Sequence, residues 1–212
     1  MPNHTIFNER PESQDRALKV IEKLGYTIVP RSEAEKKRGS RRAVLFTEEL
    51  QSFLSHQTYQ FGTEERYFSG GSIAKAMQTM DQFSAAGLYA ENKTIYELLC
   101  AGKSMEEDLP DGTRQSFDLS FIDFEHPENN TFQVTDEFEV ERPNGKFARP
   151  DIVVLVNGIP LVVIECKKSS VDVMEGVNQN IRNWGEEYIP HLFRYSQLVI
   201  AVNPDKVLYG TC

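Results

Sequence analysis

The spacing of apolar residues predicts a chain that is helical in its first half. Apolar positions recur every three or four residues in four segments, which predicts helices over 12–24, 44–54, 72–87 and 94–101. Gly25 is a natural stop for the first of these helices, and a short strand is expected at 26–29. The portion up to about residue 116 is therefore predicted to be mostly helical.

The pattern changes near residue 117 to short runs rich in Val, Ile and Phe and bounded by turn residues. These runs predict strands over 118–124, 132–140, 151–156, 161–167 and 197–203. Between the last two, a helix is expected over 171–184, with one face formed by Val173, Val177, Ile181 and Trp184. The order of elements predicts an α/β fold in which a mixed β-sheet is flanked by helices.

The chain is expected to form a single domain over residues 1–212, because neither an internal repeat nor a long linker interrupts it. Its helical N-terminal portion would cover about 1–116, and its sheet core would cover about 117–212.

The strongest local signal is a hairpin, in which two apolar strands flank Asn157-Gly158. Asp151 lies at the end of the first strand that is remote from the turn, and Glu165 and Lys167 lie at the corresponding end of the second. Because side chains alternate along a strand, Glu165 and Lys167 share one face and Cys166 points to the other.

The register of this hairpin decides whether Asp151 joins Glu165. A two-residue loop with unbroken pairing sends the two carboxylates to opposite faces. A three-residue loop with a left-handed Gly158 pairs Leu155 with Ile159 and brings the carboxylates to one face. We expect this second register, although a bulge elsewhere in the hairpin, for example at Pro160, would have the same effect.

Two carboxylates and a lysine at one strand end suit metal-assisted hydrolysis of a phosphodiester. Carboxylate oxygens are ligands for Mg²⁺, which keeps several waters and binds substrate phosphates. Lys167 would orient or activate a water molecule and offset the charge on a pentavalent phosphate. The alternative interpretation is a structural ion pair at the strand ends.

The net charge and its distribution along the chain indicate which kinds of partner the protein could bind. The net charge of −9 argues against simple non-specific DNA binding. The distribution is uneven, however, since Arg31–Arg42 holds six basic residues against two glutamates, whereas 104–141 holds twelve acidic residues against one arginine. The basic segment is either a solvated loop or a contact for nucleic acid or a partner.

The chain is expected to be cytoplasmic and not to interact with membranes. No apolar run approaches the ~20 residues that a spanning helix needs. The polar stretch Met1–Asp15 lacks the apolar core of a signal peptide. The three cysteines are far apart, which excludes a disulfide framework.

Pro150-Asp151 together with Glu165-Cys166-Lys167 resembles the PD-(D/E)xK nuclease signature. With the segments 121–132, 149–165 and 188–195, the chain resembles more specifically the N-terminal nuclease domain of the restriction (R) subunit of type I restriction-modification enzymes. These blocks occur in the family's order and the similarity covers nearly all of the chain. The resemblance implies a restriction-endonuclease-like, PD-(D/E)xK fold.

The resemblance also implies roles for individual residues. Asp151 and Glu165 would be ligands of Mg²⁺, with the backbone carbonyl of Cys166 as a further ligand, and Lys167 would be the catalytic lysine. Of the family's Gln-x-x-x-Tyr motif, Gln179 matches, whereas Asn183 stands in place of the tyrosine and lacks its ring. The alternative for this pair is two solvent-facing amides.

The function that the resemblance implies is that of a type I site-specific deoxyribonuclease. The chain would be its Mg²⁺-dependent DNA endonuclease domain, without sequence readout of its own. The methylation and specificity subunits would be partners, and ATP would serve only helicase-like motor domains of the full-length subunit, of which this chain would be a fragment. The alternatives are another PD-(D/E)xK nuclease, of the DNA repair or resolvase type, and a non-cleaving assembly module of the restriction complex.

Overall fold

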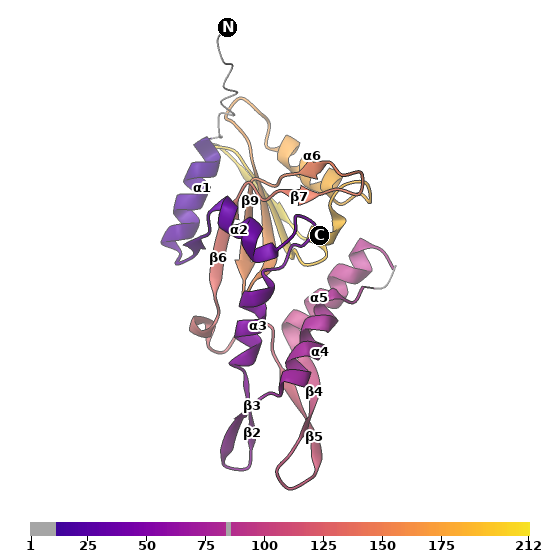
Figure 1. Ribbon diagram of the computed structural model, residues 1–212. Helices are drawn as coiled ribbons and strands as arrows, with labels where there is room; N and C mark the ends of the chain where they lie inside the picture. The colour runs from indigo at the N-terminus through magenta and orange to yellow at the C-terminus, as the bar shows by residue number, and fades with distance from the viewer. Residues whose placement is uncertain (1–11, 84–85) are drawn as a thin grey trace.

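A mixed β-sheet organises the chain, as the sequence predicts. The computed structural model describes residues 12–83 and 86–212 (Figure 1). Within these residues the largest sheet has six strands in the order β1-β6-β9-β10-β11-β12. The central strand β10 runs antiparallel to β9 and parallel to β11. The strands are β1 (Thr27–Ile28), β6 (Phe132–Asp136), β9 (Ile152–Val156), β10 (Ile159–Cys166), β11 (Leu198–Val202) and β12 (Val207–Gly210).

Helices cover both faces of this sheet. Helix α1 (Glu12–Lys23) packs on one face, where Leu18 is buried with Val134, Ile152 and Ile164. The other face carries the larger core, in which Val153, Leu155 and Val163 are buried. The elements on that side include α2 (Arg31–Arg38), α3 (Thr47–Ser55), α6 (Met174–Asn183) and α7 (Pro190–Phe193). All five residues of β9 are buried, because the strand is apolar on both faces.

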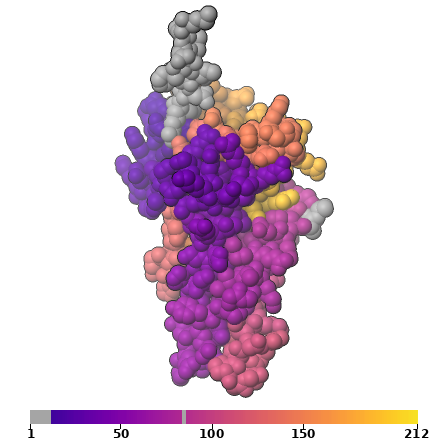
Figure 2. All heavy atoms as spheres, in the orientation of Figure 1, coloured from indigo at the N-terminus to yellow at the C-terminus, as the bar shows by residue number. Residues whose placement is uncertain are grey.

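Two hairpins extend away from the large sheet, as Figures 1 and 2 show. They are formed by β2 (Thr58–Phe61) with β3 (Glu64–Tyr67), and by β4 (Lys103–Asp108) with β5 (Arg114–Leu119). Helices α4 (Gly70–Asp81) and α5 (Leu88–Ala101) lie alongside them. The first half of the chain is therefore less purely helical than predicted, because these charged, largely exposed strands carry little apolar periodicity.

Two of the predicted strands have different bounds in the structure. The strand expected over 118–124 ends at Leu119, and a one-turn helix, η1 (Pro127–Asn129), follows. The strand expected over 132–140 is interrupted by Glu137, whose φ of 52° is left-handed. Beyond this break, β7 (Val140–Glu141) pairs with β8 (Phe147–Ala148) instead of continuing in the large sheet.

The turn of the central hairpin differs from the predicted one, but Asp151 and Glu165 still lie on the same face of the sheet, as predicted. Asn157 and Gly158 form a two-residue loop with φ values of 50° and 78°, so the three-residue loop was wrong and the left-handed Gly158 is confirmed. The pairing then shifts by one residue between Pro160 and Val162. This bulge brings Ile164 opposite Ile152, and hence Glu165 to the position facing Asp151.

Residues 1–11 lie outside the described part of the chain. The expectation that Met1–Asp15 is not a signal peptide concerns mostly these residues, so it stays a prediction. Among the helices that the structure describes, none is long and apolar enough to cross a membrane.

The turn predicts a strong effect of a single methyl group at position 158. A Cβ on Gly158 would lie 2.3 Å from the carbonyl oxygen of Phe46. Gly62 has a similar φ of 61° with open space around it, so Gly62→Ala carries only the backbone cost. We expect Gly158→Ala to lower the free energy of unfolding by about 1–3 kcal/mol more than Gly62→Ala in chemical denaturation. If both variants lose the same free energy of unfolding, the close approach of position 158 to the Phe46 carbonyl does not contribute to the cost of the substitution.

Candidate active site

The carboxylates of Asp151 and Glu165 lie side by side at the ends of β9 and β10. The backbone N–H of Cys166 donates a hydrogen bond of 2.7 Å to Oδ2 of Asp151, which holds this carboxylate against β10. Glu165 is 0% exposed, and neither of its oxygens receives a hydrogen bond from the residues that the structure describes. The structure thus brings together the two acidic residues that the sequence predicts for the site.

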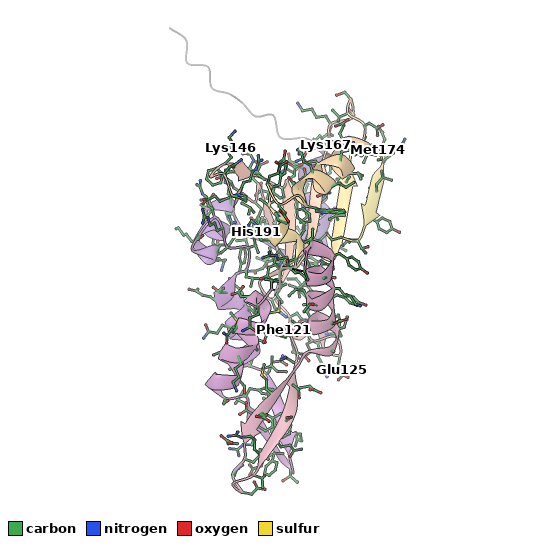
Figure 3. The ribbon with its side chains drawn as sticks, turned by 90° about the vertical axis from the view of Figure 1, so that its right-hand side faces the viewer. Phe121, Glu125, Lys146, Lys167, Met174 and His191 are labelled. Atoms are coloured by element: carbon green, nitrogen blue, oxygen red, sulfur yellow. The ribbon has the colours of Figure 1, made fainter. Side chains whose placement is uncertain are left out.

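Lys167 completes the cluster and connects it to α6. Its Nζ lies 3.8 Å from Oε2 of Glu165 and donates a hydrogen bond of 2.6 Å to Oε1 of Gln179. Figure 3 shows Lys167 and Met174, the first residue of α6, at the end of the molecule away from the two hairpins. The four side chains predicted for the catalytic site are therefore contiguous in the structure.

The orientation of α6 corrects one prediction. Its buried residues are Gly176, Asn180 and Asn183, whereas Ile181 is 51% exposed, so the expected apolar face is wrong at that position. The cause is a close approach at Gly176, where an added Cβ would lie 2.9 Å from Ala201 and 3.5 Å from Glu165. Asn183 is buried and Gln179 binds Lys167, so the alternative of two solvent-facing amides is wrong as well.

Burial dominates the electrostatics of the two carboxylates. The pKa of Glu165 lies well above its usual range, first because the group is buried and second because Asp151 adds a like charge. Burial also raises the pKa of Asp151, while the hydrogen bond from Cys166 and the charge of Lys167 oppose that shift. A buried carboxylate without hydrogen bonds is costly unless a cation compensates it.

The donor set fits a hard divalent cation with few protein ligands. In an extended strand the N–H and C=O of one residue point to the same side, so the carbonyl of Cys166 faces Asp151, as its N–H does. Its thiol is buried on the opposite face, as predicted. In the described part of the chain, no group of three or more His, Cys, Asp or Glu residues could hold a metal. Two carboxylates and one carbonyl leave room for the waters that Mg²⁺ retains.

Two residues of α1 and one after β6 also contact this cluster, and the sequence analysis missed all three. Ser13 donates a hydrogen bond of 2.8 Å to the carbonyl of Lys167, and Gln14 donates one of 3.1 Å to the carbonyl of Asp151. The backbone N–H of Glu137 donates a bond of 2.8 Å to the same carbonyl. For Ser13 and Gln14 the only signal in the sequence was the presence of polar residues in the first turn of a helix, and no signal pointed to Glu137.

The basic segment Arg31–Arg42 forms local ion pairs instead of a free positive surface. Arg31 and Arg41 reach Glu139 at 2.9 and 2.8 Å, and Arg42 reaches Glu141 at 2.9 Å. Arg38 is buried, with its guanidinium carbon 4.0 Å from the ring centre of Phe138. These contacts favour a structural role over a contact with nucleic acid.

Because burial raises the pKa of Glu165, its charge opposes folding in the absence of a cation. The folded chain binds this proton more tightly than the unfolded chain, so stability should fall as pH rises above the ordinary pKa of 4.5. In EDTA at pH 7 we expect Glu165→Gln to raise the free energy of unfolding by on the order of 1–3 kcal/mol. The exposed Glu186→Gln should change it little, and a loss of stability in Glu165→Gln would contradict this account.

Comparison with known proteins finds similarity to endonuclease subunits of type I restriction enzymes. The HindI endonuclease subunit of a type I restriction enzyme from Haemophilus influenzae is 29% identical over 203 residues, which cover 92% of this chain and 18% of that protein. The SsaAORF53P endonuclease subunit from Staphylococcus saprophyticus, also of a type I enzyme, is 42% identical over 85 residues, covering 40% of this chain and 9% of that protein.

The chain spans about a fifth of the length of the curated relatives that match it along most of its sequence. A family model described as the N terminus of the type I restriction enzyme R protein matches residues 6–212. The match covers nearly the whole chain, as the sequence resemblance implies. The chain therefore belongs to the family of N-terminal regions of type I restriction enzyme R proteins.

Proposed function

We propose that this chain is the nuclease domain of a type I restriction enzyme and hydrolyses phosphodiester bonds of DNA with Mg²⁺. The observation that carries the proposal is the contiguous cluster of Asp151, Glu165 and Lys167, in which the buried Glu165 accepts no hydrogen bond from the residues that the structure describes. Such a carboxylate is expected where a cation binds, and the position of Lys167 suits an anionic substrate. The restriction-endonuclease-like PD-(D/E)xK fold is part of the same proposal.

Asp151, Glu165 and the carbonyl of Cys166 would hold the cation. When bound, Mg²⁺ polarises the scissile phosphate and lowers the pKa of water. In the hydrolysis, the oxygen of a water molecule attacks phosphorus while the bond to the leaving oxygen breaks, and that oxygen takes up a proton. Lys167 offsets the charge that builds on the phosphate, and Gln179 fixes the Lys167 ammonium through the hydrogen bond from Nζ.

The remaining functions of the enzyme would lie outside this chain. With a net charge of −9, the chain attracts DNA weakly by itself, and its basic segment is already paired with glutamates. We propose that motor domains of the full-length subunit deliver DNA using ATP, and that methylation and specificity subunits recognise the sequence. Family membership favours this restriction role over a repair or resolvase nuclease.

Substitution of the clustered residues tests the proposal directly. In the assembled enzyme, Asp151→Ala, Glu165→Ala and Lys167→Ala should each lower DNA cleavage at least about 100-fold, because the first two remove a ligand of the cation and the third removes the positive charge beside the reacting phosphate. ATP hydrolysis should persist, since none of the three belongs to a motor. The matched control is Lys168→Ala, at the exposed neighbouring lysine. Cleavage of plasmid DNA at the parent rate by Glu165→Ala would refute the assignment.

The net charge leads to a second expectation, for the chain alone. At physiological salt and micromolar protein, the 212-residue chain should nick plasmid DNA much more slowly than the assembled enzyme, because it gains little affinity from phosphate contacts. Lowering the salt concentration should raise the rate only modestly. Nicking by the chain as fast as by the assembled enzyme would show that delivery by other domains is unnecessary.

A further inference from the structure

The first turn of α1 holds both halves of the catalytic motif by their backbone. Ser13 and Gln14 are adjacent, and they bind the carbonyls of Lys167 and Asp151, which are 154 and 137 residues away in sequence. Gln14 also donates a hydrogen bond of 3.3 Å from Nε2 to Oε1 of Glu137. No other contact in the described site joins the ends of β9 and β10 through one helical turn.

Gln14 has an unusual environment for a side chain in the first turn of a helix. It is 0% exposed, and its Oε1 is buried without a hydrogen-bond partner among the described residues. An unpaired buried carbonyl oxygen loses its hydrogen bonds to water without replacement, so such groups are rare and call for an explanation. Oε1 is bonded to the same carbon as the Nε2 that contacts the backbone carbonyl of Asp151, so the unpaired acceptor lies beside the Asp151 backbone at the strand ends.

Glu137 is kept from this cluster by other contacts. Its Oε2 lies 2.6 Å from Nε of Arg149, and its Oε1 accepts the bond from Gln14. Its left-handed φ is uncommon for a residue other than glycine and marks a strained position. Gln14 therefore connects the backbone of Asp151 to a neighbouring carboxylate that is already paired.

We propose that Gln14 is a positioning residue of the metal site. This inference rests on the proposed function, and it assigns a role to each end of the amide. The Nε2 group fixes the Pro150-Asp151 segment and Glu137, and Oε1 accepts a hydrogen bond from a water molecule in the hydration shell of the cation. Partners of this kind, which orient ligands and do not touch the metal, change metal affinity by about 10–100-fold when they are removed.

The test measures binding of Mn²⁺, as a probe for Mg²⁺, to the 212-residue chain by paramagnetic resonance of the free ion. Gln14→Met keeps the volume of the side chain and removes both polar atoms, so we expect binding about tenfold weaker. Gln14→Glu keeps an oxygen acceptor but loses the Nε2 donor to Asp151 and Glu137, so it should bind Mn²⁺ more tightly than Gln14→Met and more weakly than the parent chain.

Gln133 provides a matched control. It is also a buried glutamine whose Oε1 lacks a partner, and it pairs with Leu155, four residues or about 13 Å along β9 from Asp151. Gln133→Met should therefore leave the Mn²⁺ affinity unchanged, even where it shifts the thermal midpoint as much as Gln14→Met does. An equal loss of affinity in both variants would overturn the proposal, since it would indicate a general effect of disturbing the core.

The outcomes separate this inference from the proposed function. If Asp151→Ala abolishes Mn²⁺ binding while Gln14→Met binds as the parent does, the role of Gln14 is refuted and the metal site stands. If Asp151→Ala binds Mn²⁺ with unchanged affinity, the metal site itself is refuted. Should Gln14→Met not fold, Gln14→Leu takes its place with the same expected loss, and Mn²⁺ binding at the parent's affinity in that variant would refute the role of Gln14.

Discussion

The structure depends on one costly arrangement, the burial of a carboxylate at the end of an apolar strand. Glu165 is the next-to-last residue of a strand whose neighbouring residues pack in the apolar core, and its own oxygens lack hydrogen-bond partners in the described part of the chain. Water would stabilise such a group better than protein does, so the fold must supply compensation. Lys167 supplies part of it at 3.8 Å, and the proposed cation would supply the rest.

Several local features follow from placing polar groups around this carboxylate. Helix α6 approaches β10 and β11 closely at Gly176, and this contact turns Asn180 and Asn183 inward while Ile181 faces outward. On the opposite face, α1 buries Leu18 in the apolar cluster and extends its first turn to the strand ends. Both helices thus pack apolar residues against the sheet and place amide or hydroxyl groups next to the candidate site.

The central hairpin shows how a register is chosen. Its two-residue turn is stabilised by Asn157, whose side chain accepts a bond of 2.8 Å from the N–H of Thr131 and donates one of 3.0 Å to the carbonyl of Phe121. With that turn, unbroken pairing would separate the carboxylates. The shift between Pro160 and Val162 restores their common face, so the extra residue connects a favourable turn to a functional site.

The sequence alone determined which charged residues of the two hairpin strands meet in the candidate site. Asn157-Gly158 between apolar runs predicts the hairpin, and side-chain alternation places Glu165 and Lys167 together and Cys166 apart. The tertiary structure decided the form of the turn. A two-residue turn with a bulge and a three-residue turn both place Asp151 and Glu165 on one face of the sheet, so the sequence pattern cannot choose between them and packing does. The roles of Gln14 and Ser13 were likewise decided there, since hydrogen bonds to backbone carbonyls more than a hundred residues away leave no pattern in the chain.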